Sequence, residues 1–530
     1  MVKRLIFFGI GFLISFTSFA QSGFSVELTE ISVPNYPAIH SGAHAEFNGK
    51  WLFIGGRTNG LHGFHTNDGF PTENANAAIW VIDINSSTVN STPTASLADT
   101  LEESINSSNM QYFQDGNTLY MVSGYGWKAA ANRFETFQTL TAVDVQGLVN
   151  AVETNTDISP YFRQILDSNL AICGANLQKL GNSFYLVFGH RFDGTYSHNS
   201  IGNFYTQTYS NAVKKFNISD DGTTMSLIGF QIIEDTLNFH RRDYNLVPQI
   251  YPDGQEGFTA FSGVFQKGIN IPYYTSIDLN SNGINHIPGF NQNLSQYHNA
   301  VMPLYDSAAN AMHAVFFGGE SMYRFDTVSN TLITDSLVPF VKTISCVSRH
   351  ADSSLVESLL PITMPGFLGS NASFIPLPTI QKYANGVLKL DAINGRTLVG
   401  HIVGGIESPE ANISATDPTL SFASSRIFEV YLNDIAVSAK EKTIEEPALL
   451  SLYPNPATDN ITMEISTSKP ENIEVLLLNS RGKIMETIFA KKAFLGKEIL
   501  KRNLSNYNAG MYFSLLKTER FSRAYRFVVR

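Results

Sequence analysis

Six short apolar runs that each end in glycine recur between residues 51 and 405, and they constrain the fold more than any other feature. They are rich in aromatic and branched residues and too short for helices, so each predicts a buried strand. Their closing glycines are 68, 65, 74, 56 and 86 residues apart. The runs are WLFIGG (51–56), TLYMVSG (118–124), SFYLVFG (183–189), GFTAFSG (257–263), HAVFFGG (313–319) and LVGHIVGG (398–405).

A second element with alternating residues follows each run and ends in a turn. Asp or Asn holds the matching place in each, where its side chain can bond backbone amides and begin a hairpin. With a strand before each run and another after each turn, the pattern predicts six four-stranded units, which are typical of a β-propeller; seven blades is the alternative. The elements are IWVIDINSSTV (79–89), LTAVDVQGLV (140–149), AVKKFNISDDG (212–222), YTSIDLNSNGI (274–284), YRFDTVSNTLI (323–333) and RIFEVYLND (426–434).

The two ends of this repeat fit a closed ring. FSVELTEISV (24–33) precedes the first unit, and the sixth unit ends near Asn433 after its third strand. An N-terminal strand that completes the sixth unit would leave no exposed edge, which protects against aggregation. We therefore expect the chain to close the ring with its own N-terminal strand.

The glycine-ended runs resemble the kelch repeat, whose hydrophobic strand ends in Gly-Gly. The resemblance covers about residues 35–434, but only the first, fifth and sixth units keep both glycines. The period exceeds the ~50 residues usual for kelch, and we assign the surplus to loops at 57–77, 190–211 and 341–368. The resemblance implies an all-β chain: a six-bladed kelch-like β-propeller at 21–434, followed by a smaller C-terminal domain.

Residues 1–20 have the pattern of a secretory signal peptide. Lys3 and Arg4 precede the apolar run LIFFGIGFLISF, and Ser18-Phe19-Ala20 offers small residues at the cleavage site. The run is shorter than the roughly 20 residues that span a bilayer, which disfavours a membrane anchor. We expect export to the periplasm and no transmembrane segment in the mature chain.

After a charged linker at 435–447, residues 448–530 change pattern and predict a small Ig-like β-sandwich. This segment closely resembles the type A C-terminal sorting domain of proteins that Bacteroidota export by type IX secretion; an ordinary Ig-like module is the alternative. The resemblance implies the secretion machinery as a partner, and a final location at the cell surface or in the medium. The motif residues are Tyr453, Pro454, Asn455, Pro456, Gly482, Gly510 and Tyr512.

Charge excludes one class of partner. The chain carries 36 basic and 46 acidic residues, a net charge of −10. Residues 447–530 hold 13 basic and 7 acidic residues, and residues 1–20 hold the basic Lys3 and Arg4, so residues 21–446 hold 21 basic and 39 acidic ones, or −18. A body this acidic is a poor match for nucleic acid, which is bound largely through Lys and Arg. We expect no nucleic-acid partner.

Motifs for cofactors and metals are missing from the sequence. No HExxH, GxSxG, phosphate-binding or dinucleotide-binding pattern occurs, and we expect no cofactor. His62 and His65 could ligate a metal but have little carboxylate support, so we expect none. Cys173 and Cys346 fit two buried thiols, with one disulfide as the alternative. Neither cysteine sits in the motif of a copper-radical oxidase of the galactose oxidase type.

Polar residues recur in the first strand of successive units, where apolar residues surround them. In a propeller these innermost strands line the central channel, and unsolvated polar groups there need partners from each other, water or ligand. A ring of water-bonded channel residues is one reading, and a ligand site at the axial mouth is the other. We predict one mouth formed by His44, Asn109, Asn176, Arg241, Arg242, Asn245, His298 and Asn371.

The function predicted from these observations is that of a non-catalytic binding protein for a glycan or another surface protein. The absence of a clustered catalytic motif favours it. The alternative is a carbohydrate-active or other small-molecule enzyme with its site at the same mouth. Convergence of two carboxylates, or of three histidines with a carboxylate, would favour the enzyme.

Overall fold

The structure is a computed structural model of the chain. It describes residues 23–63, 68–197, 204–287, 289–326, 331–413, 420–434, 442–443, 448–479, 483–518 and 522–530. The predicted signal peptide, and all of the predicted linker except Lys442 and Thr443, lie outside the described residues. Within these ranges, no helix has both the length and the apolar character needed to cross a bilayer.

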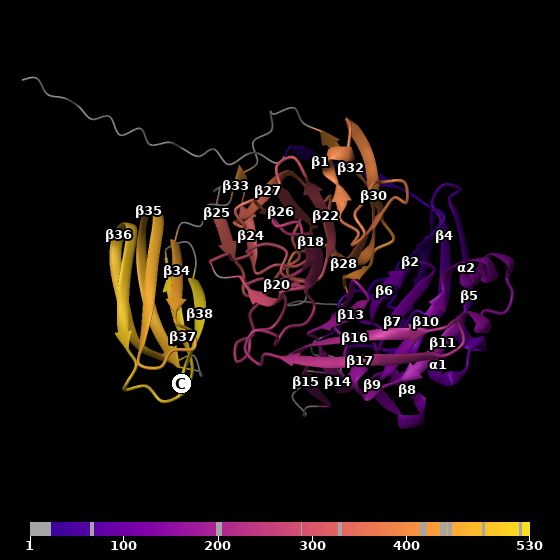
Figure 1. Ribbon diagram of the computed structural model, residues 1–530, viewed down its shortest axis with the longest axis horizontal. Helices are drawn as coiled ribbons and strands as arrows, with labels where there is room; N and C mark the ends of the chain where they lie inside the picture. Colours follow the sequence, from indigo (N-terminus) through magenta and orange to yellow (C-terminus); the bar gives the residue numbers. More distant parts are fainter. Residues whose placement is uncertain are drawn as a thin grey trace, which may run out of the picture.

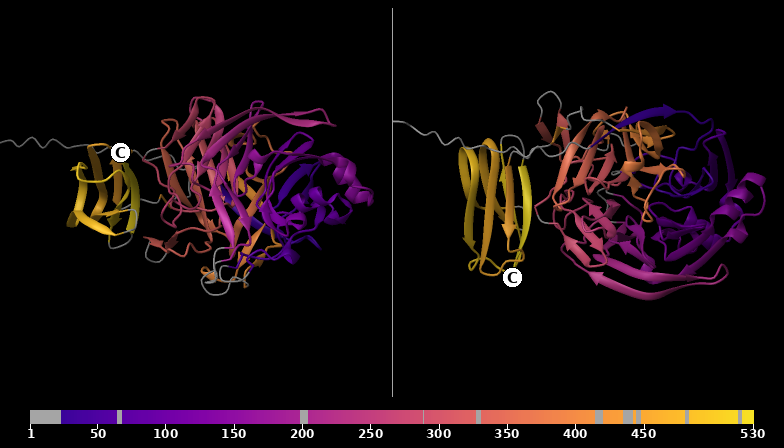
Figure 2. Two further views of the ribbon diagram at one scale, coloured as in Figure 1. Left: turned by 90° about the horizontal axis from the view of Figure 1, so that it is seen from below. Right: turned by 45° about the horizontal axis from the view of Figure 1, so that its top comes forward.

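The described part of residues 24–434 is mainly β, with six sheets of at least four strands arranged around a common centre (Figures 1 and 2). The first three sheets contain β2 (Ala43–Phe47), β3 (Lys50–Ile54), β4 (Ala78–Asp83) and β5 (Thr88–Pro93); β6 (Gln111–Asp115), β7 (Thr118–Val122), β10 (Thr139–Asp144) and β11 (Phe162–Leu166); and β12 (Asn176–Leu180), β13 (Ser183–Val187), β16 (Ala212–Asp220) and β17 (Met225–Glu234).

The other three sheets follow the same plan. They contain β18 (Asn245–Ile250), β19 (Glu256–Phe261), β20 (Ile277–Asn280) and β21 (Gly283–His286); β22 (Ala300–Asp306), β23 (Ala311–Phe317), β26 (Thr343–Arg349) and β27 (Leu355–Thr363), with β29 (Leu388–Lys389) and β33 (Lys442–Thr443) at the edges; and β28 (Phe367–Pro376), β30 (Arg396–Ser408), β32 (Ile427–Asp434) and β1 (Phe24–Ile31), with β31 (Phe422–Ala423). The strand pairs in these six sheets are antiparallel except for β22 with β29.

Smaller elements connect these sheets. Three two-stranded ribbons are formed by β8 (Tyr125–Lys128) with β9 (Arg133–Thr136), β14 (His190–Gly194) with β15 (Tyr205–Tyr209), and β24 (Tyr323–Asp326) with β25 (Thr331–Thr334). The described α-helices are α1 (Asp99–Ile105) and α2 (Val145–Thr154). Short 3₁₀ turns lie at Thr72–Asn74, Thr94–Ser96, Ala129–Ala131, Ser159–Tyr161, Ser168–Leu170 and Leu390–Ala392.

The chain closes the ring with its own first strand. β1 pairs antiparallel with β32 over eight residues, from Phe24 opposite Asp434 to Ile31 opposite Ile427. The N-terminal strand thereby covers what would be the free edge of the last sheet. This closure matches the sequence prediction.

The six glycine-ended runs form the second strand of each sheet: β3, β7, β13, β19, β23 and β30. The glycines permit close contact between the end of this strand and the chain before it. Gly56 has a φ of 87°, and a Cβ there would lie 2.3 Å from the carbonyl oxygen of His40. Any other residue would therefore clash at this position.

The core is built between neighbouring sheets. Val122 and Leu140 of one sheet pack with Leu186 and Phe216 of the next in one buried cluster. Clusters of this kind repeat around the ring, for example where Phe261 meets Phe316. Because every sheet buries both faces against its neighbours, the innermost strands hold a fixed geometry at the centre.

Two segments differ from the sequence prediction. YRFDTVSNTLI (323–333) does not supply the third strand of the fifth sheet but the separate β24–β25 ribbon, and β26, within a segment assigned to a loop, takes that place. In the second unit, α2 replaces the expected turn directly after β10, because the Asp144 side chain accepts a hydrogen bond from the Gly147 amide and caps the helix.

The C-terminal residues form a separate sheet with its own core, beside the ring (Figure 1). β35 connects the sheet by pairing with β34 and β36 in its first half and with β36 and β37 in its second, with β-bulges between. Bulges bend a strand, so one continuous sheet can enclose the cluster around Ile461, Val475 and Phe527. Its strands are β34 (Ala448–Tyr453), β35 (Asn460–Asn479), β36 (Ile484–Asn503), β37 (Gly510–Lys517) and β38 (Ser522–Val529).

Candidate functional site

Six residues in or just before the innermost strands form a circle around the axis, and five backbone hydrogen bonds link them one to the next. One residue from each sheet takes part: Ser41, Asn109, Gly174, Asp243, His298 and Asn371. Each amide from Asn109 onward donates to the carbonyl oxygen of the preceding member, at 2.9, 3.2, 2.9, 3.1 and 2.9 Å in that order. Five successive bonds of the same kind place the six sheets around one axis.

The residue types in this circle follow from backbone conformation. Asn109, Asp243 and Asn371 have φ values of 55°, 49° and 54°, in the left-handed region. Ser41 and Gly174 lie there too, at 59° and 62°. Asn, Asp and Gly tolerate this region better than most residues. The backbone conformation alone therefore accounts for much of the recurrence of Asx residues at these positions.

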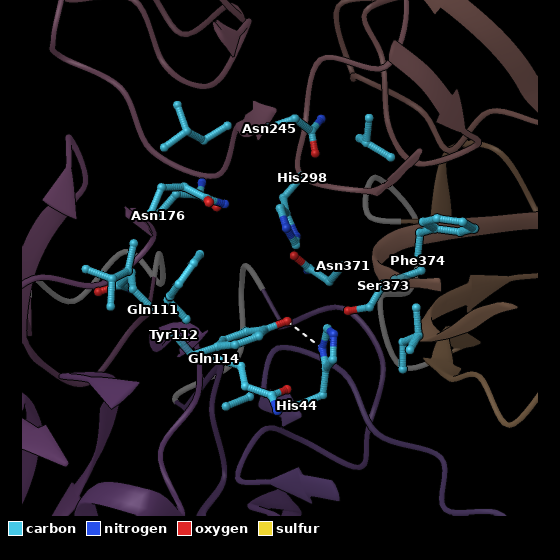
Figure 3. Close-up of a pocket in the computed structure, with 18 of the residues that line it drawn as sticks. His44, Gln111, Tyr112, Gln114, Asn176, Asn245, His298, Asn371, Ser373 and Phe374 are labelled. Carbon is cyan, nitrogen blue, oxygen red and sulfur yellow. Dashed lines mark hydrogen bonds between the residues drawn. The ribbon is translucent and has the colours of Figure 1, made fainter. Parts of the chain in front are cut away.

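Inside the circle lies an axial cavity of about 750 Å³ (Figure 3). The innermost strands β2, β6, β12, β18, β22 and β28 all line it, and residues 382–386 line it as well. Its volume falls within the roughly 300–1,000 Å³ of small-molecule sites. Nine of the lining side chains are amides: Asn109, Gln111, Gln114, Asn176, Gln178, Asn245, Asn299, Asn371 and Asn385.

The structure brings together six of the eight residues that the sequence analysis places at one mouth. The six that line the cavity are His44, Asn109, Asn176, Asn245, His298 and Asn371. Arg241 and Arg242 are not among the lining residues.

The expected place of Arg241 is wrong, because its side chain is fully buried within the protein. Its Nε donates to the carbonyl oxygen of Asn238 at 2.9 Å, and its Nη1 donates to those of Ser262 and Thr275 at 2.8 and 2.6 Å. Nη2 donates to Thr275 Oγ1 at 2.8 Å, and the guanidinium carbon lies 4.1 Å from the centre of the Tyr273 ring. All of these contacts hold the fold together.

Arg242 lies just outside the cavity and is already paired. Its Nη1 forms an ion pair with Asp243, which lines the cavity. Its Nε donates to Tyr209 Oη at 3.2 Å, and its guanidinium carbon lies 5.4 Å from the centre of the Phe265 ring. A contact between the Arg242 guanidinium and a ligand in the cavity would require this arrangement to break.

Several amide side chains of the cavity are already hydrogen-bonded to other groups of the protein. Asn245 Nδ2 donates to Tyr297 O and Asn299 Oδ1, both at 2.9 Å, and its Oδ1 accepts from the Asn299 amide. Asn299 Nδ2 in turn donates to two backbone carbonyls. Gln114 bridges β6 to β2 through both the amide and the carbonyl of Glu46. These amides join neighbouring sheets and have little bonding capacity left for a ligand.

A second group of amides keeps free capacity, and it lies mainly on β6 and β12. Gln111 is 2% exposed, its Nε2 donates to Asn109 O, and its Oε1 has no hydrogen-bond partner. Asn176 uses Nδ2 on Tyr244 O, which leaves Oδ1 available. No side-chain hydrogen bond is recorded for Asn109 or Gln178 within the described residues.

Three histidines line the same cavity: His40, His44 and His298. Tyr112 Oη and His44 Nδ1 are 2.6 Å apart, and burial lowers the pKa of His44 to about 4, with His298 adding to the shift (Figure 3). Burial also lowers the pKa of His298, against the opposing effects of Asp243 and of a hydrogen bond with Asn371. The imidazoles of His44 and His298 are neutral at pH 7 and act there as hydrogen-bonding groups.

Sequence reasoning missed Gln111, Tyr112, Gln178 and Phe374, which all line the cavity. The available signal was the whole first strand of each unit, because polar and aromatic residues continue for several positions past the ones selected. In Figure 3, Gln111 and Asn176 lie on one side of the cavity and Phe374 lies on the opposite side.

The described residues show no metal site. No group of three or more His, Cys, Asp or Glu side chains among them could hold an ion. His65, one of the two histidines considered as ligands, lies outside the described residues. Cys173 and Cys346 are both buried free thiols.

The sorting-motif residues tie the start of the C-terminal sheet to its last strand. Asn455 Nδ2 donates to Arg526 O at 3.0 Å, and its Oδ1 accepts from the Val528 amide at 3.0 Å. Tyr512 is 8% exposed and donates to Asn508 O at 3.0 Å. Tyr453, Pro454, Pro456 and Gly510 are also described, whereas Gly482 lies outside the described residues.

The C-terminal part of the chain matches a known protein family. Residues 451–530 match the family described as secretion system C-terminal sorting domain. The match supports export by type IX secretion, to the cell surface or the medium, and interaction of this domain with the type IX secretion machinery. No curated protein matches the chain.

Two solved structures are similar to 76% and 96% of the chain at low sequence identity. The protein YjhT is 10% identical, with a TM-score of 0.39, and the alignment covers 76% of this chain and all of that one. A fungal alcohol oxidase of the AA5 family, in complex with copper, is 8% identical, with a TM-score of 0.36 over 96% of this chain and 99% of that one. Because both TM-scores are low, the description of the ring rests on its own strand pairings.

Proposed function

We propose that the chain is an exported binding protein of Bacteroidota, with a signal peptide at 1–20, a linker at 435–447 and a sorting domain at 448–530. Between them, residues 21–434 form a six-bladed kelch-like β-propeller; the six sheets and the circle of hydrogen-bonded residues support this assignment. An Ig-like sandwich for the last domain is supported by the way β34 and β37 pair with opposite halves of β35.

The export proposal predicts the ends of the mature protein. Mass spectrometry of the cell-surface or secreted form should find Gln21 at the N-terminus and no peptides beyond about residue 450, because the sorting domain is removed after export. A variant truncated before residue 448 should remain in the periplasm. Recovery of the intact chain from the cytoplasm would contradict the proposal.

The axial cavity is the ligand site of this binding protein, and its ligand is a glycan. The observation that carries the proposal is the set of uncommitted amide groups on β6 and β12, which face a wall containing Phe374 across about 750 Å³. Amides supply a donor and an acceptor side by side, as sugar hydroxyls require. Aromatic rings pack against the apolar face of a sugar ring.

A paired substitution tests this site. The double variant Asn176→Ala/Gln178→Ala removes two ligand contacts and should weaken glycan binding by about 2 kcal/mol, at about 1 kcal/mol per neutral hydrogen bond. That is a roughly 30-fold rise in Kd. A glycan array with the mature protein identifies the sugar, and calorimetry measures the change in Kd.

The matched control is Gln231→Ala, which removes an exposed amide from the outer strand β17. It should leave binding unchanged. NMR of the recovered sugar should show it unaltered, whereas chemical conversion would favour the enzyme alternative. Equal binding by the double variant and the wild type would remove the cavity from consideration.

A further inference from the structure

We propose that the axial cavity selects uncharged sugars and excludes sugars that carry a carboxylate, an inference that rests on the proposed function and names its ligand class. Four features of the cavity lead to it: its few charges, the engagement of the nearest arginines, its neutral histidines, and the arrangement of its polar and apolar walls.

The first feature is the small number of charged side chains. Among the described residues that line the cavity, three carry a charge at pH 7: Glu46, Asp243 and Lys382. One of Glu46's carboxylate oxygens accepts a hydrogen bond from the Gly49 amide at 2.6 Å, within its own β-turn. Asp243 is paired with Arg242, and Glu46 is balanced by Lys382, so the wall has no net positive charge to attract an anion.

The second feature is that the nearest arginines are engaged elsewhere. Arg242 is held by Asp243, Tyr209 and the Phe265 ring, and Arg241 by three backbone carbonyls and a hydroxyl. A carboxylate ligand would have to compete with Asp243 for Arg242 at the edge of the cavity. Displacing Asp243 would leave one carboxylate unpaired in a poorly solvated place, so the exchange gains nothing.

The third feature is the state of the histidines that line the cavity. Burial lowers the pKa values of His40 and His44 to about 4, and lowers that of His298 as well. At neutral pH these rings therefore contribute no positive charge. Both ring nitrogens of His40 are already hydrogen-bonded to Ser41 and Asn59, and Nδ1 of His44 is hydrogen-bonded to Tyr112. Any hydrogen bond that these rings offer a ligand therefore comes from a neutral imidazole, which suits a hydroxyl group.

The fourth feature is the division of the cavity into a polar and an apolar side. Asn109, Gln111, Asn176 and Gln178 lie on β6, β12 and the residues just before them, whereas β22 and β28 contribute mainly apolar residues, Val301, Pro303, Phe374, Ile375 and Pro376, beside Asn371 and Ser373. A neutral sugar ring has polar edges and apolar faces, so it can satisfy both sides at once. A carboxylate would lose its water to amides and hydrocarbon, with no cation in return.

A comparison of matched glycans tests the selectivity. The probes are pairs that differ by one carboxylate: lactose with sialyllactose, and xylo-oligosaccharides with and without a glucuronic acid branch. They are measured with the mature protein at pH 7 by array and calorimetry. The neutral member of at least one pair should bind, and its acidic partner should bind roughly tenfold or more weakly.

A charge-gain variant sharpens the test. Gln178→Arg adds an unpaired cation to the amide wall and should weaken binding of the neutral sugar while it strengthens binding of the acidic partner. Gln231→Arg adds the same charge on the exposed outer strand β17 and should change neither, which controls for the net charge of the protein.

The outcomes distinguish a failure of the proposed glycan site from a failure of its proposed selectivity. If wild-type protein binds an acidic sugar as tightly as its neutral partner, and Asn176→Ala/Gln178→Ala weakens both, the cavity is a glycan site but the selectivity is wrong. If no sugar of either kind binds, the proposed function fails and the selectivity fails with it. Preference for the neutral member, reversed by Gln178→Arg alone, supports both.

Discussion

Replacing Arg241 by alanine should destabilise the ring by roughly 3–5 kcal/mol, the combined effect of buried acceptors that lose their donors and of a large side chain removed from a packed site. The side chain is fully buried and makes four hydrogen bonds, three of them to the backbone carbonyls of Asn238, Ser262 and Thr275. Its loss leaves these acceptors without a donor and opens a gap against the Tyr273 ring.

Urea unfolding followed by tryptophan fluorescence measures this effect in the intact chain. All three tryptophans, Trp51, Trp80 and Trp127, precede the C-terminal sheet, so their emission reports on the ring alone. Arg191→Ala is the control, because Arg191 is 42% exposed by side chain and pairs with Asp193 at the surface. It should change stability by less than about 1 kcal/mol. Equal stability of the two variants would show that the buried network contributes nothing.

The sequence located the cavity well because a repeated unit repeats its geometry. Polar residues at matching places in successive first strands must meet at the axis if the units form a ring, and six of the eight selected do so. The sequence alone did not show why several of these positions hold asparagine. Asn109 and Asn371 occupy left-handed backbone positions, where Asn is favoured with or without a ligand. One sequence cannot separate these two causes.

The misplaced arginines show where a simple rule would have helped. Arg241 and Arg242 are adjacent, and adjacent residues in extended chain point to opposite sides. Both could not face the same mouth. The Arg241 side chain lies in the core, and the Arg242 side chain lies between Asp243 and Tyr209, outside the cavity lining. Composition favoured this cluster because it was the densest in charge, but such density can equally be a structural network.

Two segments were assigned wrongly from the sequence, α2 and the third strand of the fifth sheet. The sequence contained enough information to assign the first correctly but not the second. In α2, Val145, Leu148, Val149 and Val152 are all buried, and their spacing of three, four and seven residues is that of a helix. That signal was present beside the Asx residue that suggested a turn. In the fifth sheet, 323–333 and 343–349 are both alternating strands, and only their tertiary partners decide which one joins β23.

Lowering the pH from about 6.5 to 4 should destabilise the ring by several kcal/mol, even though most carboxylates keep their charge over the upper part of this range. His313 is 4% exposed and His40 is 7% exposed, and burial lowers the pKa of each to about 4. The unfolded chain then binds protons near pH 6.5 that the folded ring does not. Stability is complete above pH 6.5 and falls as the pH approaches 4, by about 3 kcal/mol for each such residue.

Burial of Glu320 acts in the opposite direction over part of the same range. It raises the pKa of that carboxyl to about 7, so the folded state binds the proton first and gains stability as the pH falls. One such group is outnumbered, because burial lowers the pKa of His44 to about 4 as well, as it does for His313 and His40. The free energy of unfolding should therefore decrease as the pH falls, because the effect of the histidines exceeds that of Glu320.

Urea midpoints by tryptophan fluorescence at pH 7.5, 6.5, 5.5 and 4.5, values chosen to bracket the ordinary histidine pKa of about 6.5, give the slope. His313→Gln removes one of the buried imidazoles, whose Nδ1 lies 2.8 Å from Ser348 Oγ. Glutamine can keep a hydrogen bond to Ser348 but cannot take up a proton. The variant should therefore lose less stability between pH 6.5 and 4.5 than the wild type does, whatever its stability at pH 7.5. Parallel pH profiles would show that the folded ring accommodates a protonated His313, and that the acid sensitivity arises elsewhere.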